Sequence, residues 1–297
     1  MAEHTSTVLA EGRYFCEGPR WRAGRFWFSD FYAGEVCSID VHGQLVTELA
    51  LEGEQPSGLG WLPDGRLLVV GMTKRQVLRR ELDGSVAVHA ELGDIATFHA
   101  NDMLVTPDGD AYVGNFGFDL DGLLIAEGEE GLLDRLFTDP TPFMANLAHV
   151  TVDGGASVAA SDLLFPNGMV LLDGGATLVV AQTLGMELTA FDRAADGALS
   201  NRRTWASLAQ PDGTMIAPDG ISADAQGGIW VANALGTQVV RVEEGGAITD
   251  TVTTTQNAYA CCMGGRDSCD LLICTAPTSV HTMVEAQPLA RLELVQR

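Results

Sequence analysis

Basic side chains are scarce in this chain of 297 residues. Lys and Arg together number 17, with Lys74 the one lysine, against 40 Asp and Glu, which gives a formal net charge of −23. A surface this acidic repels phosphate backbones and anionic lipid headgroups. We therefore expect no nucleic-acid partner and no membrane partner, and small molecules or cations instead. The sequence leaves the oligomeric state open.

Long apolar runs and paired cysteines are lacking as well. The first fifteen residues hold an acid and polar residues where a signal peptide has a basic start and an apolar run. No stretch approaches the roughly 18 apolar residues of a membrane-spanning helix. We therefore expect a soluble, cytoplasmic protein. The cysteines show neither a CxxC pair nor a framework spacing, which favours reduced thiols on buried strands: Cys16, Cys37, Cys261, Cys262, Cys269 and Cys274.

Signatures of several common enzyme classes are absent. The chain has no GxSxG elbow, no HExxH pair, no Walker loop and no GxGxxG after a strand. Their absence excludes the commonest serine hydrolases, zincins, NTPases and Rossmann enzymes. The segment Asp119-Leu120-Asp121-Gly122 resembles a calcium loop but lacks its spacing and its closing Glu. We expect a hairpin turn there.

What the chain does contain is a succession of short apolar runs, such as RLLVVG, TLVVAQ and GIWVAN, separated by Gly and Asp-Gly punctuation. Runs of this length, rich in Val, Leu, Ile and Trp, are typical of strands. Asp-Gly supplies the positive φ that tight hairpins need. The Asp residues of the nine Asp-Gly pairs are Asp64, Asp83, Asp108, Asp121, Asp153, Asp173, Asp196, Asp212 and Asp219.

The strands repeat in a common register. In each unit a small or polar residue, usually followed by Gly, precedes an apolar stretch, and a turn follows six or seven residues later. The units recur at close to the ~40–50 residues of a four-stranded propeller blade. The pattern predicts an all-β fold, one six-bladed β-propeller over residues 1–297. The six leading positions, called slots below, are Glu17, Ser57, Asn101, Asn167, Asp219 and Cys261.

One interval between slots is too long for a blade alone. The excess lies at 119–149, where apolar and flexible segments alternate. Long excursions on a rigid scaffold often cap a binding site. We expect part of this insertion to be a blade strand and part to be a lid over the channel, with a longer outer hairpin as the alternative.

The slots place oxygen ligands around one mouth of the channel. Residues in the same slot of different blades converge on one ring, so two carboxylates and two carboxamides meet there. Such oxygens suit hard divalent cations, namely Ca²⁺, Mg²⁺ or Mn²⁺, and leave coordination positions open for water and substrate. Turn chemistry is the alternative for Asn167 and for Asp219 in Pro-Asp-Gly, although Asp219 precedes its strand. His99, two residues before Asn101, faces the same side by strand alternation.

These motifs resemble one known family. In order along the chain they are Glu17-Gly18-Pro19-Arg20-Trp21, Asn101-Asp102, Phe165-Pro166-Asn167-Gly168-Met169, Pro218-Asp219-Gly220-Ile221 and Trp230-Val231-Ala232-Asn233. Nearly the whole chain is similar to the family of gluconolactonases, regucalcin (senescence marker protein) and luciferin-regenerating enzymes. The resemblance implies a six-bladed propeller with one divalent cation at its mouth, Ca²⁺ first, with Zn²⁺, Mg²⁺ or Mn²⁺ as alternatives. It implies metal ligands at Glu17, Asn167 and Asp219.

The resemblance also implies roles in catalysis and substrate binding. Asp219 would be the general base, and Asn101 a further polar residue at the metal or the substrate. At position 99 the chain departs from the family, because sugar-lactonase members have Arg where this sequence has His99. Arg offers a fixed fork of donors, whereas His offers one or two. A substrate less polar than gluconolactone is therefore expected, with apolar residues near the mouth: Phe116, Phe118, Phe143 and Met144.

The function that follows is the opening of a lactone or related cyclic ester by metal-activated water, with Asp219 as base. A carboxylate beside a cation has a lowered pKa and is a weak base by itself, so the metal must acidify the water. Two alternatives stay open. One is a metal-assisted isomerase, lyase or cyclase on the same ring, since a fold does not fix its chemistry. The other is a cation-binding propeller without enzymatic activity.

Overall fold

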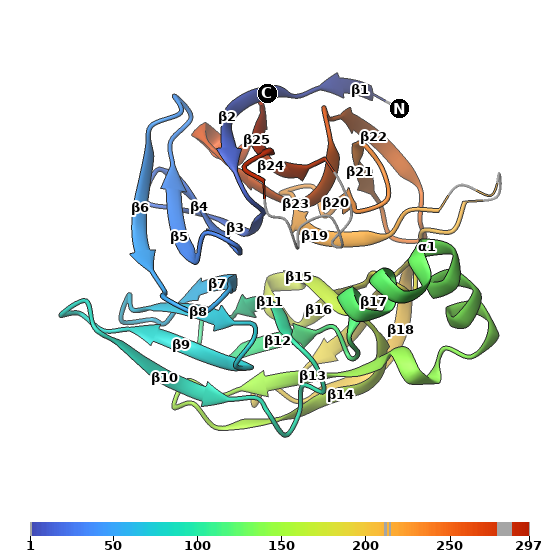
Figure 1. The fold of residues 1–297 in the computed structure, drawn as a ribbon, viewed down its shortest axis with the longest axis horizontal. Helices are drawn as coiled ribbons and strands as arrows, with labels where there is room; N and C mark the ends of the chain where they lie inside the picture. The colour runs from blue at the N-terminus through green and yellow to red at the C-terminus, as the bar shows by residue number, and fades with distance from the viewer. Residues whose placement is uncertain (1, 211–212, 214, 278–286, 297) are drawn as a thin grey trace.

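The computed structural model describes residues 2–210, 213, 215–277 and 287–296. The strands of these residues form six sheets arranged around a central axis (Figure 1). The predicted six-bladed β-propeller is therefore confirmed. Asp212, which belongs to one expected turn, lies outside the described residues.

Each blade is a mostly antiparallel sheet whose first strand is innermost. The inner strands are β3 (Cys16–Arg22), β7 (Pro56–Trp61), β11 (Ala100–Val105), β15 (Pro166–Leu172), β19 (Pro218–Ala223) and β23 (Asn257–Gly264). The second strands are β4 (Arg25–Asp30), β8 (Leu67–Gly71), β12 (Ala111–Asn115), β16 (Thr177–Gln182), β20 (Ile229–Asn233) and β24 (Asp270–Ala276).

The outer half of each blade is more exposed. The third strands are β5 (Glu35–Ile39), β9 (Gln76–Arg80), β13 (Met144–Val150), β17 (Glu187–Arg193), β21 (Gln238–Val242) and β25 (Ala290–Val295). The fourth strands are β6 (Leu45–Ala50), β10 (Val86–Glu91), β14 (Ala156–Leu164), β18 (Leu199–Ser207), β22 (Ile248–Thr253) and, from the chain start, β2 (Thr7–Arg13).

Burial explains why the second strands read as continuous apolar runs. Every residue of β8, β12, β16, β20 and β24 is buried. A strand covered on both faces needs apolar side chains on both, so alternation disappears. These strands therefore form the packed interfaces between neighbouring blades.

Close approach of the inner strands explains the Gly that follows several slots. A Cβ on Gly58 would stand 2.2 Å from the backbone nitrogen of Met103 in the next inner strand, and one on Gly168 would stand 2.5 Å from the carbonyl oxygen of Asp219. Real Cβ atoms do not come that close, so the Gly is sterically required. The inner strands thus converge until backbone meets backbone.

The ring is closed by the N-terminal segment. Strand β2 pairs antiparallel with β25 and completes the last blade, and β1 (Ala2–Thr5) pairs parallel with β22 of the preceding blade. Fully buried Glu293 of β25 joins these parts: it accepts hydrogen bonds from Thr255 Oγ1 (2.6 Å), from Thr275 Oγ1 (2.9 Å) and from the Ser6 hydroxyl. One carboxylate therefore ties the first residues to the last two blades.

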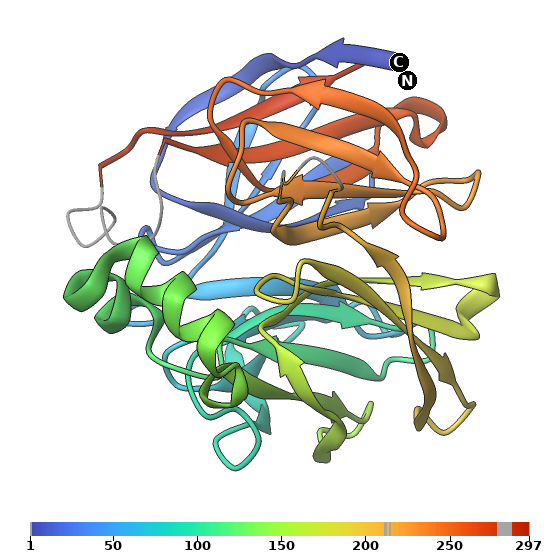
Figure 2. The same cartoon turned by 90° about the vertical axis from the view of Figure 1, so that its right-hand side faces the viewer.

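The insertion at 119–149 contains a helix, which the sequence pattern did not predict. Helix α1 (Leu120–Thr138) is followed by the 3₁₀ turn η1 (Thr141–Phe143) and by strand β13. The Asp119 side chain caps the helix by accepting from the backbone N–H of Gly122 at 2.8 Å. The predicted hairpin turn at Asp121-Gly122 is therefore wrong, because an Asp that precedes an apolar i, i+4 pattern is also an N-cap. Helix α1 lies on one face of the ring (Figure 2).

Other Asp-Gly pairs do make tight turns. Gly65, Gly109 and Gly154 have φ of 89°, 96° and 92° and follow Asp residues between paired strands. Two further 3₁₀ turns, η2 (Asp173–Gly175) and η3 (Arg266–Ser268), connect inner to second strands. The hairpin role of this dipeptide depends on its place between two strands.

The cysteines agree in part with the prediction of reduced thiols on buried strands. All six cysteines are free, and five of them are buried, but Cys269 is exposed because it follows η3 rather than lying in a strand. Within the described residues, we find no helix with the length and apolar character needed to cross a membrane.

We expect Glu293→Ala to lower the free energy of unfolding by about 3 kcal/mol, because hydrogen bonds to a charged group contribute roughly 1.5–3 kcal/mol and several buried donors lose their acceptor together. Urea unfolding followed by circular dichroism measures the change. Glu11→Ala is the control, since the Glu11 side chain on the adjacent strand is 72% exposed. An equal stability of the two variants would contradict the closing role of Glu293.

Candidate active site

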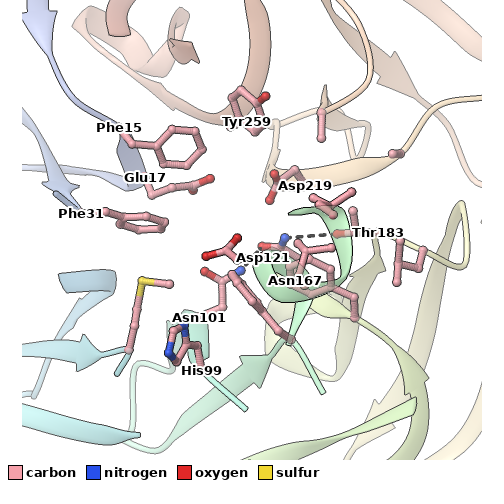
Figure 3. A pocket seen from close by; sticks show the side chains of 18 of the residues that line it. Phe15, Glu17, Phe31, His99, Asn101, Asp121, Asn167, Thr183, Asp219 and Tyr259 are labelled. Atoms are coloured by element: carbon pink, nitrogen blue, oxygen red, sulfur yellow. Dashed lines mark hydrogen bonds between the residues drawn. The ribbon is translucent and has the colours of Figure 1, made fainter. Parts of the chain in front are cut away.

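The structure brings the polar slot residues to one cavity. Glu17, Asn101, Asn167 and Asp219 line a cavity of about 160 Å³ at the end of the channel that helix α1 covers. Figure 3 shows their side chains converging from four different blades. Each comes from the first residues of an inner strand, so the six-fold repeat itself positions them.

The sixth slot needs a correction. Each inner strand loses register with its partner at the slot, for example between Pro56 and Leu59 and between Pro166 and Met169. In β23 that shift falls between Ala258 and Ala260, so Tyr259 occupies the slot and Cys261 does not. Tyr259 lines the cavity. The signal was in the sequence, because Tyr259 stands seven residues before the turn residue Arg266, within the spacing of six or seven residues that the other slots keep.

Cys261 instead faces the neighbouring blade. Its buried Sγ donates to the carbonyl oxygens of Gly220 (3.6 Å) and Trp230 (3.4 Å). Burial raises the pKa of this thiol well above its ordinary value. Cys261 is therefore a packing residue between two blades.

A chain of hydrogen bonds fixes the carboxamides. The Ser57 hydroxyl donates to Asn101 Oδ1 (3.0 Å), and Asn101 Nδ2 donates to Asn167 Oδ1 (3.2 Å). Asn167 Nδ2 donates to Thr183 Oγ1 (3.1 Å), which donates to the carbonyl oxygen of Pro218 (2.8 Å). This directional chain sets the orientation of both amides, and each Oδ1 keeps a second lone pair.

The two carboxylates are buried without a matching cation. Glu17 is 4% and Asp219 7% exposed. Glu17 Oε2 accepts from the Gly18 backbone N–H at 3.1 Å, whereas Asp219 Oδ1 has no hydrogen-bond partner among the described residues. Burial raises the pKa of both carboxyl groups well above the ordinary range. The charges of Asp219 and then Asp102 reinforce this rise for Glu17, and the charge of Asp102 reinforces it for Asp219. Asp102 itself pairs with Arg20 at 3.0 Å.

This donor set fits a hard divalent cation. An unpartnered buried carboxylate oxygen is costly unless something positive binds it. Two carboxylates and amide oxygens are the ligands of Ca²⁺, Mg²⁺ and Mn²⁺. In the described part of the chain, no three His, Cys, Asp or Glu side chains are placed so that they could hold a metal ion by themselves. The amide of Asn167 would therefore have to complete the set.

The wall above the slots is built by two further tiers of the same repeat. The second tier stands two residues before each slot and includes Phe15, Gln55, His99, Phe165 and Ala217. The third tier stands directly after each second strand and includes Phe31, Met72, Phe116, Thr183 and Ala234.

A repeated hydrogen bond joins the second and third tiers. In each of five blades the third-tier N–H donates to the second-tier carbonyl, for instance Phe31 to Phe15 (2.9 Å) and Phe116 to His99 (3.0 Å). The wall is therefore as strictly positioned by the repeat as the ring of slots. Of these wall residues, only His99 and Phe116 were predicted to lie near the mouth, although the slot register gives the positions of the others.

His99 belongs to the second tier and lines the cavity, as predicted from strand alternation. Figure 3 shows it next to Asn101. Its imidazole stacks on Phe98 with ring centroids 4.2 Å apart. Burial lowers the pKa of His99 against the opposing charges of Asp119 and Glu54. The side chain is therefore neutral at neutral pH.

The other residues predicted to lie near the mouth are found in different places. Phe116 lines the cavity, and Phe118 and Phe143 stack edge to face, with centroids 4.8 Å apart, within the apolar cluster beneath helix α1. Met144 begins β13 and pairs with Leu164. Helix α1 contributes lining residues that no motif indicated, among them Leu120, Leu124 and Leu132.

Fold and ring together define the class of this protein: a six-bladed propeller with an oxygen-lined pocket at one end of its channel. The family model for the SMP-30/Gluconolactonase/LRE-like region matches residues 15–277. The chain therefore belongs to that family, as the motifs predicted.

Individual relatives are distant. Regucalcin from Xenopus laevis is 28% identical over 275 residues, which cover 91% of this chain and 85% of the relative. A luciferin-regenerating enzyme superposes with a TM-score of 0.77 at 15% identity, over 98% of this chain and 95% of that chain. The calcium-binding protein regucalcin from Agrobacterium tumefaciens superposes with a TM-score of 0.75 at 19% identity, over 99% and 95%. These structural likenesses show the fold.

We expect the metal-free protein to lose stability as the pH rises. The folded state raises the pKa of Glu17 and Asp219, so the stabilisation from protonated carboxyls is complete below about pH 4 and is lost as the pH rises through the folded-state pKa values. Asp219→Asn should therefore be more stable than the wild type at pH 7.5 in EDTA and less dependent on pH. Thermal unfolding from pH 4 to 8 tests this, and a wild type that gains stability over that range would contradict it.

Proposed function

We propose that this protein is a divalent-cation-dependent hydrolase that opens a lactone or related cyclic ester. The observation that carries the proposal is the pair of buried carboxylates, Glu17 and Asp219, converging with Asn167 in a small cavity, with Asp219 Oδ1 unpartnered. Membership of a family described by its gluconolactonases supports the reaction class. The cavity of about 160 Å³ suits a small molecule as substrate.

Glu17, Asn167 and Asp219 would hold the cation, with Ca²⁺ first. The described donor set is oxygen-rich and lacks the His and Cys groups that zinc usually takes. When bound, the cation would polarise the ester carbonyl and neutralise the two buried charges. A similar structure, that of the Agrobacterium regucalcin, is described as calcium-binding, which supports the choice of ion.

The chain's own groups orient the substrate and move the proton. Asn101 and Asn167, fixed by the hydrogen-bond chain from Ser57, present polar atoms to the ester. Asp219 accepts the proton of the attacking water on a carboxylate oxygen. When the tetrahedral intermediate collapses and its bond to the ring oxygen breaks, Asp219 returns this proton to the ring oxygen, which leaves as an alcohol. The helix and the apolar tiers exclude bulk water from this step.

We expect Ca²⁺ to raise the free energy of unfolding by about 2.7 kcal/mol when its concentration is 100-fold above Kd. Glu17→Gln should remove this increment, because it removes a ligand charge. Glu54→Gln is the matched control, since Glu54 is a buried glutamate that accepts from the backbone of Gln55 and Thr73 outside the ring. Thermal or urea unfolding with and without Ca²⁺, Mg²⁺, Mn²⁺ or Zn²⁺ measures the increment, and its persistence in Glu17→Gln would remove Glu17 from the ligand set.

We expect Asp219→Asn to lower kcat for lactone opening by at least about 100-fold, the usual contribution of a general base. Asp108→Asn is the matched control. Asp108 lies in a second Pro-Asp-Gly tripeptide of identical sequence, but at an exposed turn. A pH indicator follows acid release, and circular dichroism verifies folding. Full activity of Asp219→Asn would refute the assignment of Asp219 as the general base. Loss of substrate without release of acid would favour an isomerase, lyase or cyclase.

A further inference from the structure

We propose that the compound opened at this site is a lactone or cyclic ester bearing an apolar substituent, seated between aromatic wall residues and helix α1, and not a polyhydroxylated sugar lactone. This inference rests on the proposed function and names its substrate class. It comes from the division of the cavity into a polar floor of slots and an apolar wall and roof.

Aromatic side chains form two sides of the wall. Phe15 and Phe31 of the first blade lie with ring centroids 5.1 Å apart, and Phe15 also contacts Tyr259 at 4.8 Å. On another side, Phe116 meets Phe165 edge to face at 4.6 Å. These rings are buried and belong to one apolar cluster. They offer a ligand dispersion contacts and no hydrogen bonds beyond the Tyr259 hydroxyl.

Helix α1 forms an apolar roof. Leu120 and Leu124, one helical turn apart, and Leu132 beyond the break at Gly128 are 6–7% exposed and line the cavity. The next residue after Leu124, Ile125, is 64% exposed on the outer side of the helix. One face of the helix is thus committed to the cavity.

Few polar groups remain to receive hydroxyls of a ligand. One lone pair and one N–H of the Asn101 amide are already used, by Ser57 and Asn167, and Thr183 donates to a backbone carbonyl. Outside the slots and Thr183, the polar side chains of the described lining are Gln55, Tyr32, His99 and Asp121. Several sugar hydroxyls would face Phe and Leu and lose their hydrogen bonds to water, which is unfavourable.

The test on the wild type is a homologous series. With Ca²⁺ present, kcat/KM is measured for γ-lactones carrying methyl to hexyl substituents and for glucono-δ-lactone. Because each buried methylene contributes about fourfold, we expect kcat/KM to rise by about that factor per methylene until the cavity is filled, and to be lowest for the sugar lactone. A flat series, or a preference for gluconolactone, would overturn the inference.

A pair of neighbouring variants tests the roof. Leu124→Gln should lower the hexyl-to-methyl ratio of kcat/KM by about tenfold, since a polar group then faces the chain. Ile125→Gln, on the outer side of the same turn, should leave the ratio unchanged. The ratio is insensitive to the amount of folded enzyme. An unchanged ratio in Leu124→Gln would overturn the assignment of the roof.

Binding separates this inference from the proposed function. Alkyl γ-lactams resemble these γ-lactones but resist opening, and calorimetry measures their affinity. Tighter binding of hexyl than of methyl lactam without turnover of any lactone would refute the hydrolase and support the apolar pocket. Turnover of lactones without a chain-length effect on either measurement would support the hydrolase and overturn the apolar pocket.

Discussion

The close approach of the six inner strands is the constraint on which the rest of this structure depends. Where Gly58 and Gly168 stand, a Cβ would penetrate the backbone of the next strand. Strands this close leave the slot side chains one direction, toward the end of the channel. Glu17 and Asp219 are thereby forced together in a buried place, where their charge is unfavourable without a counter-ion. The cation site is in this sense a consequence of the packing of backbone on backbone.

The same repeat divides the pocket by height. The slots carry carboxylate, amide and hydroxyl groups, and the positions two residues earlier or one strand later carry mostly apolar ones. Hydrogen bonds from Phe31 to Phe15 and from Phe116 to His99 recur from blade to blade and fix these side chains relative to the floor. Polar chemistry and apolar recognition thus occupy separate tiers, so a change in one need not disturb the other.

Sequence reasoning succeeded where the repeat is regular and failed where it is interrupted. The slot register predicted that Asn101, Asn167 and Asp219 lie together, and all three line one cavity. The sixth slot went wrong by two residues because Tyr259 is aromatic, whereas the pattern sought a small or polar residue. The helix of the insertion went unseen because Asp121-Gly122 reads equally as a turn, and only the N-cap contact of Asp119 distinguishes the two.

The sequence by itself determined the number of blades, the inner-strand register and the family, because these depend on local spacing and on turn chemistry. Only the tertiary structure decided which oxygens lack partners, how the amides are oriented and which face of helix α1 covers the cavity. Those features depend on contacts between residues far apart in the chain, such as Asn101 with Asn167 or Ser6 with Glu293. No local pattern encodes such distances, because they arise only when the ring closes.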